Sequence, residues 1–366
     1  MRVLAVDVGT GTQDILLFDS EVELENCVQM IVPSPTRLVE AEIRRATALG
    51  EGVLLTGVTM GGGPCGWAAE DHLRAGLPMY STPDAARTFD DDLERVERMG
   101  VRLVLDGQVA PAGLRRIEMR DFDYQAIEVA LRAFSVEPKL DAIAVAVFDH
   151  GAAPPGVSDR TFRFEHIAET VARNDLAAFS YLRDEIPARM TRMAGVASTV
   201  PAEVPLLMMD TGPAAVLGAL EDSRVRAASG AIVANLGNFH TLAFHVAGSR
   251  ILGLFEHHTG ELTPRKLEAY LRSLGDGSIS NTEVFSDKGH GALTVAATSS
   301  LPELLAVVGP RRNLLSGSAL RPYFAVPHGD MMLAGCYGLL RALARKRPDW
   351  GPAIDAALSR SAAPPG

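Results

Sequence analysis

The chain has 366 residues, with 35 Lys and Arg against 45 Asp and Glu, which gives a formal net charge of −10. At about 100–200 residues per domain this length suggests two domains, and a composition of 47% hydrophobic and 22% charged residues excludes wholesale disorder. The negative charge argues against nucleic acid as a partner, and the distant cysteines, Cys27, Cys65 and Cys336, exclude a local iron–sulfur or zinc-ribbon motif.

The N-terminal half alternates apolar strands with turns and helices. Asp7 lies where a signal peptide would need its apolar region, and the longest apolar run, 142–148, is far shorter than the ~20 residues of a membrane span. We therefore expect a cytoplasmic protein with no membrane contact. Strands are predicted at 2–8, 14–19, 27–33, 52–60 and 142–151. Helices are predicted at 37–49, 87–99, 124–134 and 165–193, and a loop at 152–164.

A similar order of elements recurs in the C-terminal half. It is predicted as strands at 206–210, 230–246 (two, with a turn), 249–260 and 304–308, helices at 264–274 and 331–346, and an unstructured tail at 361–366. Superposing the two hairpins places Asp7 over Asn235 and Gly9 over Gly237. We interpret this as two related lobes, 1–195 and 196–366, with a ligand cleft between them. The alternative is that any two β-hairpins look alike.

The first hairpin has a composition suited to phosphate. Gly9 and Gly11 remove Cβ atoms where a backbone must approach a ligand, and Thr10 and Thr12 add hydroxyls beside the backbone N–H groups. Asp7 ends the strand at this turn. A carboxylate beside polyphosphate requires a cation between them, so we expect Mg²⁺ at Asp7. The alternative is an ordinary hairpin with an exposed acid.

Asp210 follows four apolar residues and precedes Thr-Gly-Pro at the start of a predicted helix. It is either a catalytic base aimed at a substrate hydroxyl or a helix cap, and the two roles are partly compatible. Arg311 follows Gly309 and Pro310, where it either stacks on adenine or pairs with phosphate, or is a solvated loop charge.

A run of glycines, Gly61, Gly62 and Gly63, follows a buried strand and matches the dinucleotide pattern GxGxxG together with Gly66. Pro64 fits that pattern poorly, and we expect no suitable helix to open there. A backbone-lined substrate pocket or a plain turn is therefore favoured over a dinucleotide site.

Histidines at two strand ends are further candidates. Asp149 and His150 end a buried strand and are either substrate ligands or a pair of turn residues. His257 and His258 are adjacent, so on a strand they would face opposite ways, which is poor geometry for a shared metal ion.

Together these motifs resemble the acetate and sugar kinase, Hsp70 and actin superfamily. DVGTGTQDILLFD looks like its first phosphate loop, GAIVANLGNFHT resembles the second, and MMDTGPAAVLGAL is similar to the catalytic-base helix of FGGY-type sugar kinases. TGVTMGGGPCGW resembles a strand and hairpin of their first lobe, while LLAVVGPRRNLL and DMMLAGCYGLLRAL look like the adenosine-site loop and the helix that closes it. The whole sequence also resembles an uncharacterised prokaryotic family labelled pyruvate formate-lyase activating enzyme-related, but it lacks the cysteine cluster that radical chemistry needs.

The resemblance implies an α/β fold of two ribonuclease-H-like lobes, each a mixed five-stranded sheet with flanking helices, around a nucleotide cleft. It implies ATP and Mg²⁺ as cofactors and Asp7 and Asp210 as catalytic residues. The nucleotide-binding residues that we expect are Gly9, Thr10, Gly11, Thr12, Asn235, Gly237, Asn238, Gly309, Arg311 and Gly335. The substrate-binding residues that we expect are Gly61, Gly62, Gly63, Asp149 and His150.

The expected function is ATP-dependent phosphotransfer to a small polar metabolite that resembles a sugar or a hydroxy acid. Asn235 stands where the resemblance places an aspartate, and its amide carries no charge. This departure favours an alternative, an ATP-binding switch that hydrolyses slowly and acts on a partner protein. A non-nucleotide enzyme on the same scaffold is a third possibility.

Overall fold

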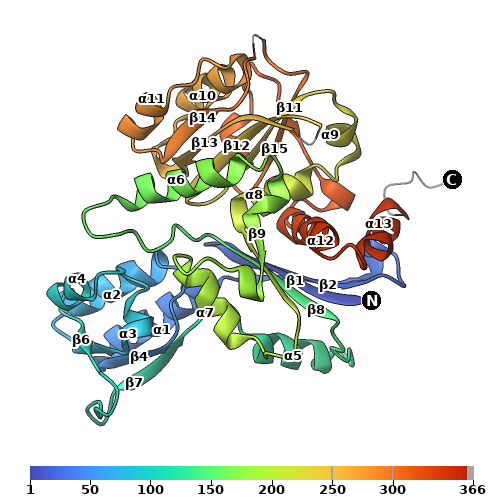
Figure 1. Cartoon of the computed structure of the whole chain (residues 1–366). Helices are drawn as coiled ribbons and strands as arrows, with labels where there is room; N and C mark the ends of the chain where they lie inside the picture. Colours follow the sequence, from blue (N-terminus) through green and yellow to red (C-terminus); the bar gives the residue numbers. More distant parts are fainter. Residues whose placement is uncertain (249, 299, 361–366) are drawn as a thin grey trace.

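A computed structural model describes residues 1–248, 250–298 and 300–360. The predicted unstructured tail, 361–366, lies outside these residues. Two six-stranded mixed sheets form the two main lobes, one above the other in Figure 1, and a smaller parallel sheet extends from the first lobe.

The first sheet has the strand order β3-β2-β1-β8-β10-β9. Three antiparallel strands come first in the chain, and two later strands lie parallel to β1. The strands are β1 (Arg2–Val8), β2 (Thr12–Asp19), β3 (Val28–Pro33), β8 (Ala142–Val147), β9 (Ser180–Leu182) and β10 (Leu206–Asp210). Because β10 pairs with β8, the predicted boundary at 195 and 196, which assigned this strand to the second lobe, is wrong for residues 206–210.

The second sheet repeats this arrangement, in the order β14-β13-β12-β11-β15-β16. Its strands are β11 (Ala231–Leu236), β12 (His240–Ala247), β13 (Arg250–His258), β14 (Gly291–Thr294), β15 (Leu304–Val308) and β16 (Tyr323–Phe324). Three successive antiparallel strands are again followed by a strand parallel to the first of them. The predicted α/β fold of two ribonuclease-H-like lobes is therefore confirmed, with six strands in each sheet instead of five.

A third sheet is inserted between β3 and β8. It is entirely parallel, in the order β6-β5-β4-β7, and its strands are β4 (Val53–Gly57), β5 (Met79–Ser81), β6 (Arg102–Leu103) and β7 (Arg115–Met119). The sequence predicted a strand and hairpin here, and no helix after the glycine run. Both expectations are wrong, because α2 (Pro64–Arg74) begins directly after Gly63 and carries the chain across to β5. Parallel strands need such a crossover, which a hairpin cannot provide.

The remaining helices flank the sheets. They are α1 (Pro35–Leu49), α3 (Pro83–Ala86), α4 (Leu93–Arg98), α5 (Tyr124–Ala133), α6 (Asp159–Val171), α7 (Thr191–Thr199), α8 (Thr211–Ala219), α9 (Ser223–Ala227), α10 (Pro264–Asp276), α11 (Asn281–Ser286), α12 (Ala334–Lys346) and α13 (Gly351–Arg360). The long helix predicted at 165–193 is wrong: α6 starts earlier, and pairing with β10 draws residues 180–182 into strand β9. Of the helix predicted at 87–99, only residues 93–98 are helical, as α4. Neither α4 nor any other helix in the described ranges is long and apolar enough to span a bilayer.

Alternation along β1 explains how the lobes are joined. Val3 and Ala5 face a core shared with α8, α12 and the second sheet, while Leu4 and Val6 face a separate core against α5 and α7. Period-two alternation puts Asp7 on the same face as Val3 and Ala5. The side chain of Asp7 therefore points toward the helices that connect the two lobes.

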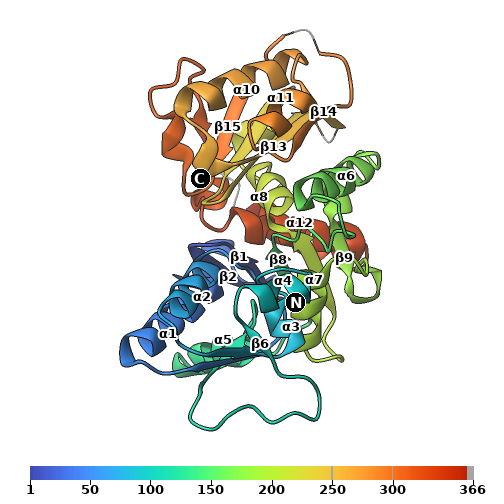
Figure 2. The ribbon, with the colours of Figure 1, turned by 90° about the vertical axis from the view of Figure 1, so that its left-hand side faces the viewer.

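Helices α8 and α12 lie between the lobes and pack closely against each other (Figures 1 and 2). The close approach depends on two glycines. A Cβ on Gly218 would collide with the Ala334 carbonyl, and a Cβ on Gly338 would collide with the Ala214 carbonyl. Both neighbours are backbone atoms, which cannot move aside as a flexible side chain can.

We expect Gly338→Ala to lower the free energy of unfolding by about 1–3 kcal/mol, the usual cost of overpacking, despite the higher helix propensity of alanine. Urea unfolding measures this change. Gly260→Ala is the control, because nothing lies within 4 Å of a Cβ placed there. Equal stability of the two variants would show that the helix crossing tolerates a side chain.

Candidate functional site

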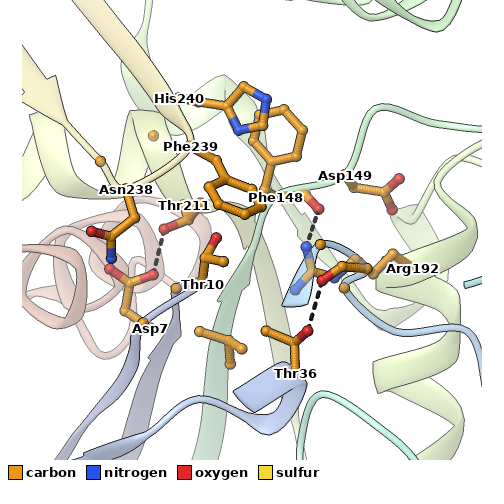
Figure 3. A pocket seen from close by; sticks show the side chains of 18 of the residues that line it. Asp7, Thr10, Thr36, Phe148, Asp149, Arg192, Thr211, Asn238, Phe239 and His240 are labelled. Atoms are coloured by element: carbon orange, nitrogen blue, oxygen red, sulfur yellow. Dashed lines mark hydrogen bonds between the residues drawn. The ribbon is translucent and has the colours of Figure 1, made fainter. Parts of the chain in front are cut away.

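Both predicted phosphate hairpins line one cavity of about 420 Å³ between the lobes. Figure 3 shows Thr10 and Asp7 of the first hairpin facing Asn238 and Phe239 of the second. The predicted site residues that line this cavity are Asp7, Gly9, Thr10, Gly11, Thr12, Gly61, Gly62, Gly63, Asp149, His150, Asn235, Gly237, Asn238, Gly309 and Gly335. Two predicted residues, Asp210 and Arg311, are not part of the lining.

The tips of the two hairpins approach each other closely. A Cβ on Gly11 would lie 2.6 Å from the Asn238 amide nitrogen, so a side chain there would require Asn238 to move. On the second hairpin, Phe239 packs against Trp67 of α2, with ring centroids 5.5 Å apart, and covers Gly63. The second lobe therefore contacts both the β1–β2 hairpin and the start of α2 beside the inserted sheet.

Asp7 is joined by a second carboxylate that the sequence reasoning missed. In the β1–β2 hairpin Asp14 is the direct antiparallel partner of Asp7, so both side chains are on the same face. The exposed fractions are 8% for Asp7 and 7% for Asp14, and both residues line the cavity. Asp7 accepts a 2.5 Å hydrogen bond from the Thr211 hydroxyl, while Asp14 Oδ1 has no hydrogen-bond partner.

Burial dominates the ionisation of this pair. It raises the pKa of Asp7 to about 7, and burial together with the nearby Asp7 charge raises the pKa of Asp14 to about 8. Among the described residues, no Lys or Arg side chain forms an ion pair with either carboxylate. Two adjacent buried carboxyl groups with an unpartnered oxygen fit a divalent cation with oxygen ligands, such as Mg²⁺.

Helix N-termini complete this end of the cavity. Thr211 and Gly212 begin α8, and Ala334 and Gly335 lie at the start of α12; all four line the cavity. A Cβ on Gly335 would collide with the Asp7 carboxylate. The positive ends of two helix dipoles thus face the same space, an arrangement that favours anions.

Gly309 lies beside the second hairpin, with φ at 99°, a backbone conformation that favours glycine. A Cβ there would meet the Leu236 carbonyl and the Asn235 side chain. Arg311 donates its backbone N–H to the Leu236 carbonyl, at 3.0 Å. The loop therefore packs against the second hairpin, and Arg311 does not line the cavity.

The glycine run after β4 lines the cavity with its backbone. Gly61 donates its N–H to Asp121, and the Gly62 carbonyl accepts a 2.7 Å hydrogen bond from the Thr36 hydroxyl. Arg192 pairs with Asp121 at 2.6 Å and donates to the Phe148 carbonyl (Figure 3). These contacts fix the loop that faces the Asp149 side of the cavity.

Asp149 lies two residues after the end of β8, is 3% exposed, and is one of the residues that line the cavity. Its two oxygens accept 2.8 Å hydrogen bonds from the backbone N–H groups of Gly151 and Met193. Burial raises its pKa despite these bonds. Each carboxylate oxygen can accept more than one hydrogen bond, so capacity remains for a ligand hydroxyl.

The structure confirms one of the two roles predicted for Asp210, that of a helix cap. Asp210 caps α8 by accepting a hydrogen bond from the Gly212 N–H, at 3.2 Å. The Asp210 carboxylate also forms an ion pair with Arg163, at 2.7 Å. Arg163 forms a second ion pair with Glu256. The geometry therefore does not bring Asp210 to the cavity wall, where a base would have to meet its substrate.

Sequence reasoning also missed Arg163, Glu256 and His240. Strand register was the usable signal for Asp14, because Asp7 and Asp14 are symmetric about the predicted turn. Arg163 gives no such signal, since it contacts Asp210 47 residues later and Glu256 93 residues later.

Solved structures with a similar arrangement have low overall similarity. The Lmo2764 protein of Listeria monocytogenes, named "a putative N-acetylmannosamine kinase", is 7% identical, with 95% of this chain and 100% of that chain covered and a TM-score of 0.35. A ROK hexokinase from Thermus thermophilus is 12% identical, with 95% and 100% covered and a TM-score of 0.32. The ethanolamine utilization protein EutJ from Carboxydothermus hydrogenoformans is 14% identical, with 94% and 89% covered and a TM-score of 0.31.

Sequence comparison is more specific. No curated protein matches the chain. A family described as "Putative pyruvate format-lyase activating enzyme (DUF1786)" matches residues 60–314. That span runs from the glycine run of the inserted sheet past the second hairpin and β15, and it covers most of the chain. The protein belongs to the DUF1786 family.

Proposed function

We propose that the protein binds ATP with Mg²⁺ between its two lobes and transfers a phosphate to a small polar acceptor that resembles a sugar or a hydroxy acid. The observation that carries this proposal is the convergence of both glycine hairpins and the Asp7–Asp14 pair on one cavity. Its volume, about 420 Å³, lies within the range of about 300–1,000 Å³ usual for small-molecule sites.

Asp7 and Asp14 are the residues that would hold Mg²⁺, which neutralises phosphate charge when it is bound. Backbone N–H groups of Gly9 to Thr12 and of the second hairpin, together with the N-termini of α8 and α12, would bind the phosphate oxygens. The acceptor would lie toward Gly61–Gly63 and Asp149. Figure 3 shows Asp149 on the opposite side of the view from Asp7.

Asp149 is the proposed proton acceptor for the substrate hydroxyl. It lines the cavity, whereas the Asp210 carboxylate is neutralised by Arg163. Burial raises the pKa of Asp149, which makes the ionised carboxylate a stronger base. Phosphoryl transfer depends mostly on positioning and charge neutralisation, so one carboxylate at the acceptor suffices.

Removing one hydroxyl from the first hairpin tests nucleotide binding. We expect Thr10→Val to weaken ATP binding in Mg²⁺ by roughly 5–30-fold, the equivalent of about 1–2 kcal/mol for one hydrogen bond to a charged group. Isothermal titration with ATP and ADP measures this. Thr282→Val, at an exposed position on α11, is the control. Undetectable ATP binding by the unmodified protein would overturn the proposal and favour a non-nucleotide enzyme.

A second candidate is an ATP-binding switch that acts on a partner protein. The contact of Phe239 with Trp67 and Gly63 favours it, because a change at the second phosphate hairpin would be transmitted directly to the inserted sheet. The uncharged Asn235 suits slow hydrolysis. ATP hydrolysis measured with pooled sugars and hydroxy acids separates the two: stimulation supports the kinase, and a flat response supports the switch.

A further inference from the structure

Three histidines converge at the edge of the cavity, outside the proposed phosphate site. His240 begins β12, His258 ends β13, and the two are direct cross-strand partners. His290 precedes β14, and its backbone N–H donates to the Glu256 carbonyl, which sets it beside β13. The ring centroids are 4.7 to 5.2 Å apart, and one ring nitrogen from each histidine lies within 4.8 Å of the other two.

The buried member of this triad has one ring nitrogen without a hydrogen bond. His290 is 3% exposed, and its Nδ1 has no hydrogen bond. A carboxylate oxygen, Glu256 Oε2, is 3.6 Å from that nitrogen. An unpaired buried nitrogen costs free energy, and a carboxylate beside one nitrogen of a histidine commonly orients the other nitrogen toward a metal ion.

The charges around the triad balance, so no net positive charge opposes a cation. The buried network next to it contains one cation, Arg163, and two carboxylates, Asp210 and Glu256. Arg160, the other guanidinium nearby, donates to the carbonyls of Phe285 and Gly289.

Other parts of the site fix the ring planes. His240 stacks on Phe148, with centroids 3.9 Å apart and an interplanar angle of 7°. His257, adjacent to His258, faces away and bonds through Nδ1 to the His258 carbonyl. The expectation that these two neighbours cannot share an ion agrees with this geometry. The sequence could not indicate that His258 instead meets His240 and His290.

We propose that His240, His258 and His290 bind one divalent transition-metal ion of the Zn²⁺ class, with an open coordination position toward the cavity. Imidazole ligands select Zn²⁺ and its neighbours over Mg²⁺, which distinguishes this site from the Asp7–Asp14 pair. Three protein ligands with a free fourth position are typical of zinc sites that bind a substrate oxygen or water. His240 and Glu256 line the cavity, so that position would face an acceptor molecule.

The test uses untagged full-length protein, stripped with chelator and then titrated with Zn²⁺ against a chromophoric chelator. We expect one Zn²⁺ per chain by elemental analysis after gel filtration, and visible ligand-field bands after substitution with Co²⁺. His258→Gln and His290→Gln should each weaken Zn²⁺ binding by at least 10-fold, the effect of losing one of three ligands. His257→Gln is the matched control, because it is buried on the same strand but faces away.

Circular dichroism establishes that each variant is folded, and a Zn²⁺-induced rise in Tm, present in the unmodified protein and absent in His290→Gln, provides a second readout. Failure of the unmodified protein to bind Zn²⁺ stoichiometrically would overturn the proposal. Equal loss in His257→Gln and His258→Gln would overturn it too. ATP titration in Mg²⁺ is a separate measurement, so failure of the metal site and failure of the proposed nucleotide site are distinguishable.

Discussion

Asp7→Asn is expected to reduce ATP-dependent turnover by roughly 10²–10³-fold, the scale of removing one preorganised electrostatic contact at a reacting centre. The asparagine keeps the shape and can still accept the 2.5 Å hydrogen bond from Thr211, but it contributes no charge to a cation shared with Asp14. Turnover measured across Mg²⁺ concentrations tests this, because the variant should require more Mg²⁺.

The same substitution should make the metal-free protein more stable at high pH. Unfolded Asp7 ionises near its ordinary pKa of 3.8, whereas burial holds the folded pKa at about 7. The unfolded state therefore loses its proton first, and this residue reduces stability as the pH rises from about 4 to 7. Asn cannot ionise, so the advantage of Asp7→Asn over the unmodified protein should grow across that window, by up to about 4 kcal/mol.

Urea unfolding in EDTA at pH 4, 6 and 8 measures this difference. Asp184→Asn, at an exposed position, is the control and should show little pH-dependent difference. Added Mg²⁺ should narrow the gap at pH 8, because it stabilises the ionised pair only in the folded state. A less stable Asp7→Asn variant at pH 8 in EDTA would contradict the argument from burial.

Arg163→Met is expected to lower the free energy of unfolding by about 3–5 kcal/mol, because it leaves two buried carboxylates without their cation. Arg163 is 1% exposed. It binds Asp210 on the first sheet and Glu256 on the second, donates to the Asp149 carbonyl, and lies 3.8 Å from the centre of the Phe148 ring. One side chain therefore joins both lobes.

Urea unfolding of Arg163→Met measures this loss. Arg132→Met is the matched control, because Arg132 makes surface ion pairs with Glu128 and Glu137, which contribute little. A change below about 1 kcal/mol in Arg163→Met would show that the network is dispensable for the fold.

Asp210→Asn separates the two roles of that residue. If Asp210 acts within the buried network, Asp210→Asn should lower the free energy of unfolding, as Arg163→Met does. A role as catalytic base alone predicts lower turnover with unchanged unfolding and unchanged ATP affinity. Parallel measurement of unfolding, turnover and ATP binding distinguishes these outcomes.

The sequence by itself determined the local framework of this protein. Strand alternation, the Gly-Thr hairpin and the restart of the pattern near residue 230 depend only on neighbouring residues, so the two lobes and both hairpins of the cavity were predictable. The paired carboxylates were also within reach, since hairpin register alone sets Asp14 opposite Asp7.

Only the tertiary structure decided which distant groups meet. The inserted strands became a parallel sheet because α2 returns the chain over it, and residues 180–182 became a strand because β10 offered an edge. Arg163 and the three histidines lie in segments whose local patterns are ordinary. Their partners are set by sheet register and lobe packing across tens of residues, and no local periodicity encodes those distances.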